Sequence, residues 1–489
     1  MTEKINHGGR LLVAIASYGT AGDRYLAQVI EEYRSMPFDV HIVVLSNIEK
    51  TVPSGVELKV GLPIRNPWSL PFAHKKVLAE HVNDYDLFIY SEEDILITQR
   101  NIDAFVEVSK VLPETEIPGF LLYENGSKGV RNCVNLYGHF HWDPASVCQR
   151  GPYTFAFLTN EHSGCYLLTR EQLQHAIDTG RYLVPPYRGK YDLACTASTD
   201  PYTVCGFRKL MCISRLDDFL VHHLPDKYTG AEFRASEQAF DKQVQALMKI
   251  GKNGTKAASL LNTETKLPAA MYSKQYDEAA RQDVLSVVPS SVNSLLSVGS
   301  GSGKSEKWLV EKGLQVTAVP LDPVIGTCLE ESGAELVYGN LCTARTKLEG
   351  RKFDCIFFSN ILHLVAHPGK VLQDYTELLE EGGYVVLVTP NVAALKNKLY
   401  GLLGKPGYRE LRDFSKGGVQ FVSQSSVNKW FAGAGLVVEN VQWTATPRFE
   451  KTVKSAPGLF GPMFGAEIIA VGVLYVQATP NGKKNHTRR

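Results

Sequence analysis

The chain of 489 residues is too long for one ordinary hydrophobic core, so two or three domains are expected. Its 44% hydrophobic and 21% charged residues are typical of a soluble globular protein, and 52 basic residues nearly balance 51 acidic ones. This balance argues against a nucleic-acid partner, and no run predicts a signal peptide or a transmembrane segment. The nine cysteines lack zinc-type spacing, which indicates reduced thiols and predicts a cytoplasmic protein.

The first half of the chain begins with alternating strand and helix patterns. Buried strands are predicted at 11–19 and 40–45, with helical spacing of apolar residues over 23–33 between them. Strand, helix and strand in this order predict a parallel, Rossmann-like sheet. Further helices are predicted at 74–82 and 101–111.

An acidic cluster follows the next predicted strand, 87–90. Glu92, Glu93 and Asp94 stand side by side where ligands bind in open α/β sheets. Adjacent carboxylates repel one another unless a cation lies among them, so the cluster predicts a divalent metal that in turn holds phosphates. The alternative interpretation is a solvated acidic turn.

Beyond Pro113 the pattern is less regular. Aromatic and polar residues over 123–153 suit either carbohydrate binding or an irregular surface segment, and Thr169 is expected to cap a helix over 171–177. His222 and His223 could return to the acidic cluster as metal ligands. The alternative is one buried, hydrogen-bonded histidine and one exposed one.

Together these pieces resemble a GT-A glycosyltransferase over about residues 10–235. The resemblance rests on Ser17-Tyr18-Gly19, the strand end at 90–95, the turn at 160–165 and the late histidine pair. It implies that Mn²⁺ or Mg²⁺ bridges the diphosphate of a nucleotide-sugar. The implied metal ligands are Glu92, Asp94 and His222 or His223, and the implied nucleotide-sugar contacts are Ser17, Tyr18, Glu92 and Glu93. The family's Asp-x-Asp motif is here Glu92-x-Asp94, which departs at its first position.

An inverting glycosyltransferase also needs a carboxylate that deprotonates the acceptor hydroxyl. Asp192 and Asp200 are the candidates. Neither lies in the Glu-Asp pair that the family often has, and a retaining mechanism stays open.

The second half has its own pattern after a polar, glycine-bearing linker. An amphipathic helix is predicted over 272–288, a strand over 294–298 and a glycine-rich loop over 299–303. A helix follows, and the next strand, 314–321, ends in Asp322, where a carboxylate can bind both ribose hydroxyls of an adenosine-type ligand. The Gly-x-Gly-x-Gly spacing suits S-adenosylmethionine (SAM) better than NAD.

This order resembles class I SAM-dependent methyltransferases, in the branch of the ubiquinone-biosynthesis O-methyltransferases, over about 270–478. The resemblance implies SAM contacts at Gly299, Ser300, Gly301, Gly303, Asp322 and Asn340. Three positions depart from the family pattern, namely Ser297 and Asn340 in place of acids and His363 within Leu362-His-Leu-Val365. His363 or His367 could deprotonate an acceptor hydroxyl, or His363 could merely line the pocket.

We therefore expect an α/β protein with two Rossmann-like domains. The predicted ranges are a GT-A-like domain at 1–250, a linker at 251–267, a methyltransferase domain at 268–480 and a disordered basic tail at 481–489. The expected function is bifunctional glycan biosynthesis, with glycosyl transfer from a nucleotide-sugar donor and O-methylation of the glycan or glycoconjugate acceptor. Peripheral membrane association and oligomer formation stay open.

Three alternatives compete with this interpretation. The chain could be a methyltransferase with a non-catalytic glycan-binding module, or a glycosyltransferase with an inert methyltransferase-like scaffold. The third alternative is a non-enzymatic assembly protein.

Overall fold

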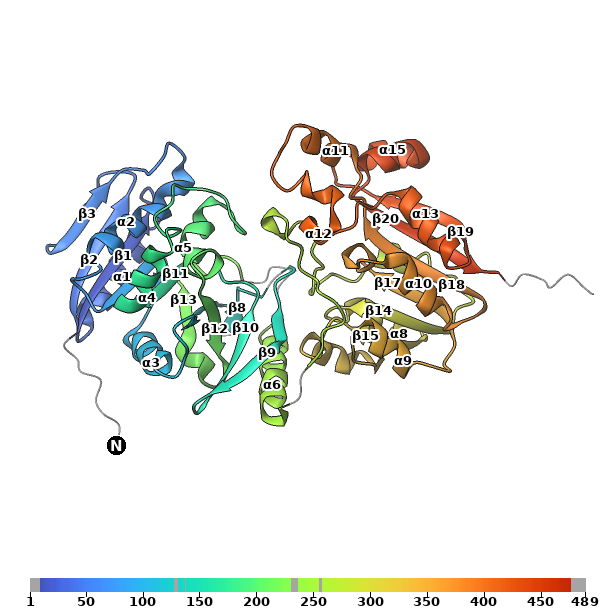
Figure 1. Ribbon diagram of the computed structural model, residues 1–489, viewed down its shortest axis with the longest axis horizontal. Helices are drawn as coiled ribbons and strands as arrows, with labels where there is room; N and C mark the ends of the chain where they lie inside the picture. The colour runs from blue at the N-terminus through green and yellow to red at the C-terminus, as the bar shows by residue number, and fades with distance from the viewer. Residues whose placement is uncertain (1–8, 127–130, 137, 230–235, 255–256, 476–489) are drawn as a thin grey trace, which may run out of the picture. The chain divides into compact units, whose positions relative to one another are not determined.

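The computed structural model describes residues 9–126, 131–136, 138–229, 236–254 and 257–475. The chain divides into two compact units (Figure 1). The N-terminal unit takes Met1–Ser259, Lys266–Ala279 and Asp322–Cys328, and the C-terminal unit takes Leu260–Thr265, Ala280–Leu321 and Leu329–Arg489. The predicted basic tail, 481–489, lies outside the described residues. None of the described helices is both long and apolar enough to cross a membrane.

A five-stranded sheet forms the centre of the N-terminal unit. Its order is β11 (Cys165–Thr169), β4 (Leu87–Glu92), β1 (Arg10–Ser17), β2 (Asp39–Ser46) and β3 (Val56–Val60). The strands from β4 to β3 are parallel, and β11 runs antiparallel to β4. Every residue of β1 after Arg10 is buried, as a parallel strand with both faces covered requires. The predicted parallel unit of β1, α1 (Asp23–Ser35) and β2 is confirmed.

Two smaller sheets complete this unit. One contains β6 (Glu116–Pro118), β12 (Arg208–Cys212), β10 (Tyr153–Leu158) and β9 (Trp142–Arg150). The other contains β5 (Ile95–Leu96), β13 (Leu220–His223), β7 (Leu121–Asn125) and β8 (Arg131–Cys133). Because β13 pairs with β5, it returns to the chain that directly follows the acidic cluster.

Most helices of this unit begin directly after a residue whose side chain caps the helix. They are α2 (Ala73–Glu80), α3 (Gln99–Ser109), α4 (Arg170–Asp178), α5 (Leu193–Thr203) and α6 (Glu237–Asn253), with 3₁₀ turns η1 (Pro67–Phe72), η3 (Ile213–Phe219) and η4 (Pro268–Ala270). The predicted cap is confirmed, because the Thr169 hydroxyl accepts from the backbone N–H of Gln172. Helix α6 begins after Ser236, whose hydroxyl accepts from the backbone N–H of Ala239.

A seven-stranded sheet forms the C-terminal unit (Figure 1). Its order is β16 (Glu335–Leu336), β15 (Gln315–Pro320), β14 (Ser294–Ser300), β17 (Phe353–Ser359), β18 (Leu379–Pro390), β20 (Glu467–Leu474) and β19 (Leu436–Thr444). The first five are parallel, and β20 is antiparallel to both of its neighbours.

The helices of this unit lie mostly between consecutive strands of the sheet. They are α7 (Gln282–Leu285), α8 (Lys304–Glu311), α9 (Leu341–Lys347), α10 (Pro368–Thr376), α11 (Leu395–Leu402), α12 (Phe414–Gly417), α13 (Gln424–Gly433), α14 (Glu450–Ser455) and α15 (Pro457–Phe464). Short 3₁₀ turns are η6 (Leu362–Leu364) and η7 (Glu410–Arg412), and η5 (Ile325–Ser332) includes residues of both units.

The predicted amphipathic helix over 272–288 is wrong. Only the single turn of α7 forms in this stretch. Ala269, Ala270 and Tyr272 have positive φ angles of 54°, 46° and 68°, which place them in the left-handed region that an α-helix of L-residues excludes. The stretch has the apolar spacing of an amphipathic helix, but its backbone before α7 is irregular.

Candidate active sites

The glycine-rich loop follows β14 at the carboxyl edge of the seven-stranded sheet. Gly299 and Gly303 have φ angles of 92° and 84°, which favour glycine. A Cβ atom on Gly299 would lie 2.5 Å from a side-chain carbon of Ile361, and one on Gly303 would lie 2.7 Å from a side-chain carbon of Leu329. Ile361 and Leu329 therefore leave room for glycine only at these two positions.

A buried carboxylate lies next to this loop. It comes from Glu306 in the following helix, and not from position 297, where the family pattern has an acid. The fully buried Ser297 hydroxyl donates to Oε1 of Glu306 over 2.7 Å, and Ser300 Oγ donates to Ser297 Oγ over 3.1 Å. Glu306 is buried in the first turn of α8. Sequence analysis missed this residue, although an acid in the first turn directly behind a glycine loop was a usable signal.

Asp322 comes just after β15 and is almost wholly buried. Its Oδ1 accepts hydrogen bonds from the backbone N–H groups of Val324 and Ile325, at 2.8 and 2.9 Å. No hydrogen bond of ordinary geometry reaches its Oδ2 among the described residues. Burial raises the pKa of this carboxyl, while the nearby His141 ring and Tyr276 hydroxyl act in the opposite direction. A buried carboxylate with one oxygen left over fits a ligand that brings hydroxyl groups.

The other sequence-predicted residues of this half lie in three different settings. Asn340 is exposed, and its Oδ1 accepts from the backbone N–H of Thr343 as the cap of α9. His363 is buried within η6, whereas His367 is exposed at the start of α10. Of the two candidate bases, only His363 thus lies inside the protein.

A polar group that sequence analysis missed lies at the same sheet edge. Asn360 directly follows β17 with a φ angle of 51°, which is uncommon for a non-glycine residue. Its Nδ2 donates to Oε1 of Glu467 over 3.1 Å, and Arg281 holds the same carboxylate at 2.9 Å. Backbone strain of this kind is concentrated at functional sites, so Asn360 is a candidate contact for the acceptor or the cofactor.

The acidic cluster of the N-terminal unit opens into a cavity of about 410 Å³. Glu92 and Glu93 line the cavity, together with the exposed rings of Tyr18 and Trp68. Burial and the neighbouring Asp94 carboxylate raise the pKa of Glu92 far above its usual range and that of Glu93 to about 7. The cluster is therefore part of a cleft and not a solvated turn, and Trp68 is a further lining residue that sequence analysis missed.

Only one of the two late histidines meets the acidic cluster. His223 Nε2 lies 3.3 Å from Asp94 Oδ2, while its Nδ1 lies 2.5 Å from Glu124 Oε1. His222 points to the opposite side of β13, where its Nε2 lies 3.0 Å from Asp226 Oδ1. The prediction of His222 as a ligand beside Asp94 is therefore corrected.

The fit of this cluster to a metal ion is partial. Within the described ranges, no group of three or more His, Cys, Asp or Glu side chains is arranged to hold one. Asp94 and His223 would be the two ligands of such an ion, and Glu124 on the second nitrogen fixes the orientation of the imidazole. Two protein ligands are sufficient for an ion that is shared with substrate phosphates, so the pair fits a bridging cation but not a closed metal cage.

The two candidate bases have different environments. Asp192 is exposed, caps α5 through the backbone N–H of Cys195, and is one of the negative charges that act on Glu92. Asp200 is fully buried, pairs with Lys75 and accepts from the Tyr187 hydroxyl over 2.7 Å. Asp200 is thus engaged in a structural ion pair, which corrects its prediction as a base.

Ser17, predicted to contact the nucleotide-sugar, is fully buried at the end of β1. Its hydroxyl accepts from Lys50 Nζ over 2.8 Å. The Ser17 side chain is therefore already engaged, unlike the exposed Tyr18 ring that follows it.

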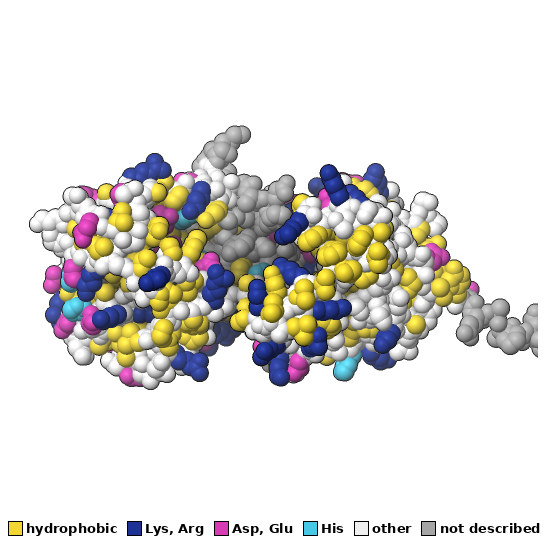
Figure 2. All heavy atoms as spheres, turned by 90° about the horizontal axis from the view of Figure 1, so that it is seen from above, with side chains coloured by type: hydrophobic (Ala, Val, Ile, Leu, Met, Phe, Trp, Pro, Cys, Tyr) yellow, Lys and Arg dark blue, Asp and Glu magenta, His cyan; other side chains and the backbone are white. Residues whose placement is uncertain are grey.

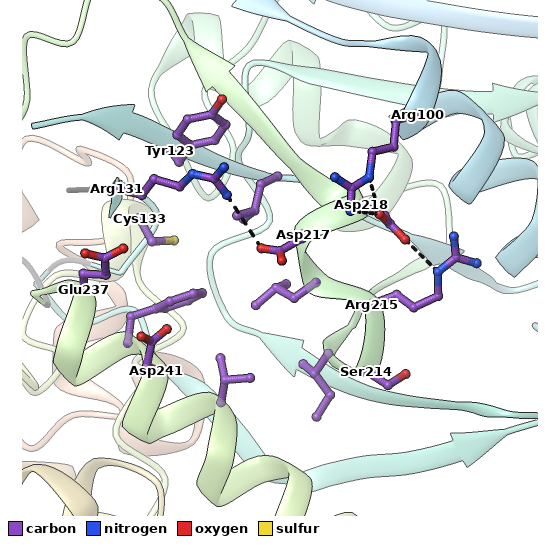
Figure 3. Close-up of a pocket in the computed structure, with 15 residues that line it drawn as sticks. Arg100, Tyr123, Arg131, Cys133, Ser214, Arg215, Asp217, Asp218, Glu237 and Asp241 are labelled. Carbon is purple, nitrogen blue, oxygen red and sulfur yellow. Dashed lines mark hydrogen bonds and ion pairs between the residues drawn. The ribbon is translucent and has the colours of Figure 1, made fainter. Parts of the chain in front are cut away.

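A second cavity in this unit, of about 420 Å³, has arginines that are already paired (Figure 3). Asp218 accepts from Arg100 over 2.5 Å and from Arg215 over 2.7 Å, and Arg131 lies 3.7 Å from Asp217. The acidic side chains of this cavity therefore already balance the charge of its three arginines.

Comparison with known proteins identifies the second half of the chain. A family model described as "Methyltransferase domain" matches residues 272–441. No curated protein sequence matches the chain.

Several solved methyltransferase structures are similar at low sequence identity. The complex of the Haloferax volcanii Trm112 activator with a putative methyltransferase is 14% identical, with 41% of this chain and 90% of that chain covered and a TM-score of 0.30. A SAM-dependent methyltransferase from Mesorhizobium loti is 15% identical, with 40% and 99% covered and a TM-score of 0.30. One from Archaeoglobus fulgidus is 12% identical, with 37% and 86% covered and a TM-score of 0.29.

The family match does not extend to the first half, so it provides no support for a glycosyltransferase there. In the second half, the matched residues lie on a mixed α/β, Rossmann-like sheet with a glycine loop after its first strand. Residues 272–441 therefore match a methyltransferase domain, and this part of the chain has a mixed α/β, Rossmann-like fold.

Proposed function

We propose that the C-terminal domain transfers a methyl group from SAM to a hydroxyl group, and that the acceptor is a sugar of a glycan. The observation that carries the SAM part is the buried Asp322 carboxylate, whose Oδ2 no hydrogen bond of ordinary geometry reaches among the described residues and which follows the strand next to the glycine loop. A carboxylate in this position binds ribose hydroxyls.

The remaining residues have supporting roles in this proposal. Gly299 and Gly303 let the loop pack closely against Ile361 and Leu329, and Glu306 holds the loop through Ser297. Bound SAM supplies an electrophilic methyl group. The acceptor hydroxyl needs a group that takes its proton, and His363 and His367 are the candidates.

The N-terminal unit supports a second function, glycosyl transfer from a nucleotide-sugar. The specific observation is the cavity at the ends of β1 and β4, where the Tyr18 and Trp68 rings stand beside Glu92 and Glu93. Aromatic faces can stack on a base, and the carboxyl edge of such a sheet is where nucleotides bind.

In this second function, Asp94 and His223 would hold a divalent cation, whose charge would offset that of the departing nucleoside diphosphate. Asp192 is the preferred base for the acceptor hydroxyl, because it is exposed and close enough to the cluster for its charge to act on Glu92. With both activities in one chain, the glycosylated product would be held near the methyl donor site.

The deciding experiment is calorimetric titration of the full chain with SAM, and separately with UDP, GDP and CMP, each with and without Mn²⁺. The proposal predicts SAM binding without a metal and binding of one nucleotide that depends on Mn²⁺. Absence of SAM binding at high micromolar concentration would leave an inert scaffold, and absence of any nucleotide binding would reduce the first unit to a non-catalytic module.

If SAM and one nucleotide both bind, methylation assays with candidate sugars test whether the two activities share one substrate. Acceptance of non-carbohydrate acceptors alone would contradict it.

A further inference from the structure

Two helical insertions of the C-terminal unit leave the sheet at its carboxyl edge. The first, 395–417, contains α11 and lies between β18 and α13; the second, 445–464, contains α14 and α15 and lies between β19 and β20. Pro390 at the end of β18 pairs with Glu467, which also pairs with Thr444 at the end of β19. Both insertions therefore start from the edge that carries the glycine loop, and α11 packs against α15.

Large apolar side chains are exposed on these insertions. Within the described part of the C-terminal unit, seven large apolar side chains are exposed, and five of them lie here: Leu399, Leu402, Leu403, Leu459 and Met463. Leu402 and Leu403 are 75% and 73% exposed, more than any other large apolar side chain among the described residues. Figure 2 looks onto the side where Figure 1 draws α11 and α15, and shows apolar side chains gathered there with Lys and Arg around them. Contiguous exposed apolar surface marks an interaction site.

The charge of the two insertions is strongly basic. They contain nine Lys and Arg residues against three Asp and Glu residues, whereas the whole chain has a net charge of +1. The basic residues are Lys396, Lys398, Lys405, Arg409, Arg412, Lys416, Arg448, Lys451 and Lys454. Two of them have an acidic partner within their own insertion, namely Lys416 with Asp413 and Lys454 with Glu450.

We propose that this basic leucine surface, made of the five exposed apolar residues and the nine basic ones, docks on an anionic lipid bilayer. Leucines that enter the acyl boundary and lysines at headgroup level are the combination that holds a helix in the interface plane. Each basic side chain near an anionic leaflet adds to the attraction. Because none of the described helices can span a bilayer, the surface would lie on the membrane and not in it.

Charge also argues against the other obvious occupant, a second copy of the chain. Two such surfaces face to face would bring two strongly basic patches together, and like charges oppose association. A leaflet of anionic lipids offers the opposite charge and an apolar interior at once.

Docking would turn the carboxyl edge of the sheet toward the bilayer, so the methyl acceptor would be a hydroxyl on a lipid-linked molecule. This consequence rests on the proposed methyl transfer, whereas membrane binding does not, so a binding test and an activity test can fail separately.

The test is co-sedimentation of the full chain with vesicles of phosphatidylcholine alone and with 30% phosphatidylglycerol, at low and high salt. We expect binding only to the anionic vesicles, and we expect it to fall as salt rises. The variants L402E/L403E and K396E/K398E should each weaken binding about tenfold or more, because the first loses leucine area that enters the acyl boundary and the second reverses charge that the headgroups attract. Matched controls in the same unit are V437E, at another exposed apolar residue, and K429E, at an exposed lysine of α13.

The proposal is overturned if wild type binds anionic vesicles no better than neutral ones, or if L402E/L403E binds as wild type does. Circular dichroism and SAM binding of each variant exclude misfolding as the cause of a loss. Sedimentation velocity gives the remaining outcome: a wild-type dimer that L402E/L403E converts to a monomer, without vesicle binding, would assign the surface to self-association and also overturn the proposal.

Discussion

The Nε2 atom of His223 lies 3.3 Å from Oδ2 of Asp94. Burial alone would lower the pKa of His223, but its hydrogen bonds to Asp94 and Glu124 outweigh burial and raise that pKa. The two residues come from distant parts of the sequence, and the pairing of β13 with β5 brings them together. In the proposed glycosyl transfer, these two residues would hold the divalent cation.

Substitution of His223 should therefore weaken metal-dependent nucleotide binding. We expect His223→Ala to lower the affinity for the nucleoside diphosphate in Mn²⁺ by about 10–100-fold, as loss of a metal ligand or its orienting partner does. His222→Ala is the matched control and should change little, because His222 faces Asp226. Calorimetry with and without Mn²⁺ measures both, and equal effects of the two substitutions would contradict the assignment.

The pair Asp192 and Asp200 separates catalysis from stability. Asp200→Asn leaves the buried Lys75 without its counter-charge, so we expect a loss of about 3–5 kcal/mol in the free energy of unfolding. Asp192→Asn retains an oxygen that can cap α5, so it should change stability by less than about 1 kcal/mol while abolishing sugar transfer. Urea unfolding and a transfer assay measure the two effects, and the reverse pattern would restore Asp200 as the base.

Removal of Asp322's charge should weaken SAM binding. Asp322→Asn retains an acceptor for the Val324 and Ile325 N–H groups but loses the charged oxygen, so affinity should fall by about 10–100-fold. Asp354→Asn is the control, because Asp354 Oδ2 also accepts from two backbone N–H groups, those of Asn293 and Ser294. If both substitutions reduce SAM affinity equally, Asp322 does not bind the ribose.

The carboxylate of Glu306 should be replaceable by one at position 297. Glu306→Ala removes the acceptor of the Ser297 hydroxyl, and we expect SAM affinity to fall by about tenfold, the value of one buried hydrogen bond to a charged group. The double variant S297D/E306A restores one buried carboxylate beneath the loop and should recover most of the affinity. Failure of the double variant, with its fold retained by circular dichroism, would show that Glu306 acts in another way.

Lys209 should make the stability of the N-terminal unit depend on alkaline pH. Burial lowers its pKa to about 8, while its Nζ donates to the Glu161 carbonyl and to the Ser163 hydroxyl. Between pH 8 and the ordinary value of 10.5, the unfolded chain binds the proton that the folded chain has released, so stability from this group rises with pH. Wild type should therefore gain stability relative to Lys209→Met as pH rises from 8 to 10. Urea unfolding of both proteins measures the difference, and a constant difference would contradict the lowered pKa.

Local sequence patterns were sufficient to predict the strand and the helix on either side of the glycine-rich loop. They were not sufficient to predict contacts between residues that lie far apart in the sequence. The strand, glycine loop and following helix at 294–311 formed as predicted, because all three signals are local. His222 and His223 were indistinguishable in sequence, and the alternation of side chains along β13 separated them. Asp200 was misjudged because its environment depends on Lys75, which lies on α2. Glu306 was missed because the family pattern has its acid at position 297, where this chain has Ser297.

The two basic insertions also affect which changes in length the sequence can accept during evolution. The ladder of β18, β20 and β19 is complete without them, since its hydrogen-bonded pairs lie between Leu436 and Thr444 and between Glu467 and Leu474. Lengthening or shortening either insertion would therefore leave the sheet and the glycine loop intact. Homologues could exchange these segments and adapt to a different acceptor or cellular surface while the methyl-donor chemistry stays the same.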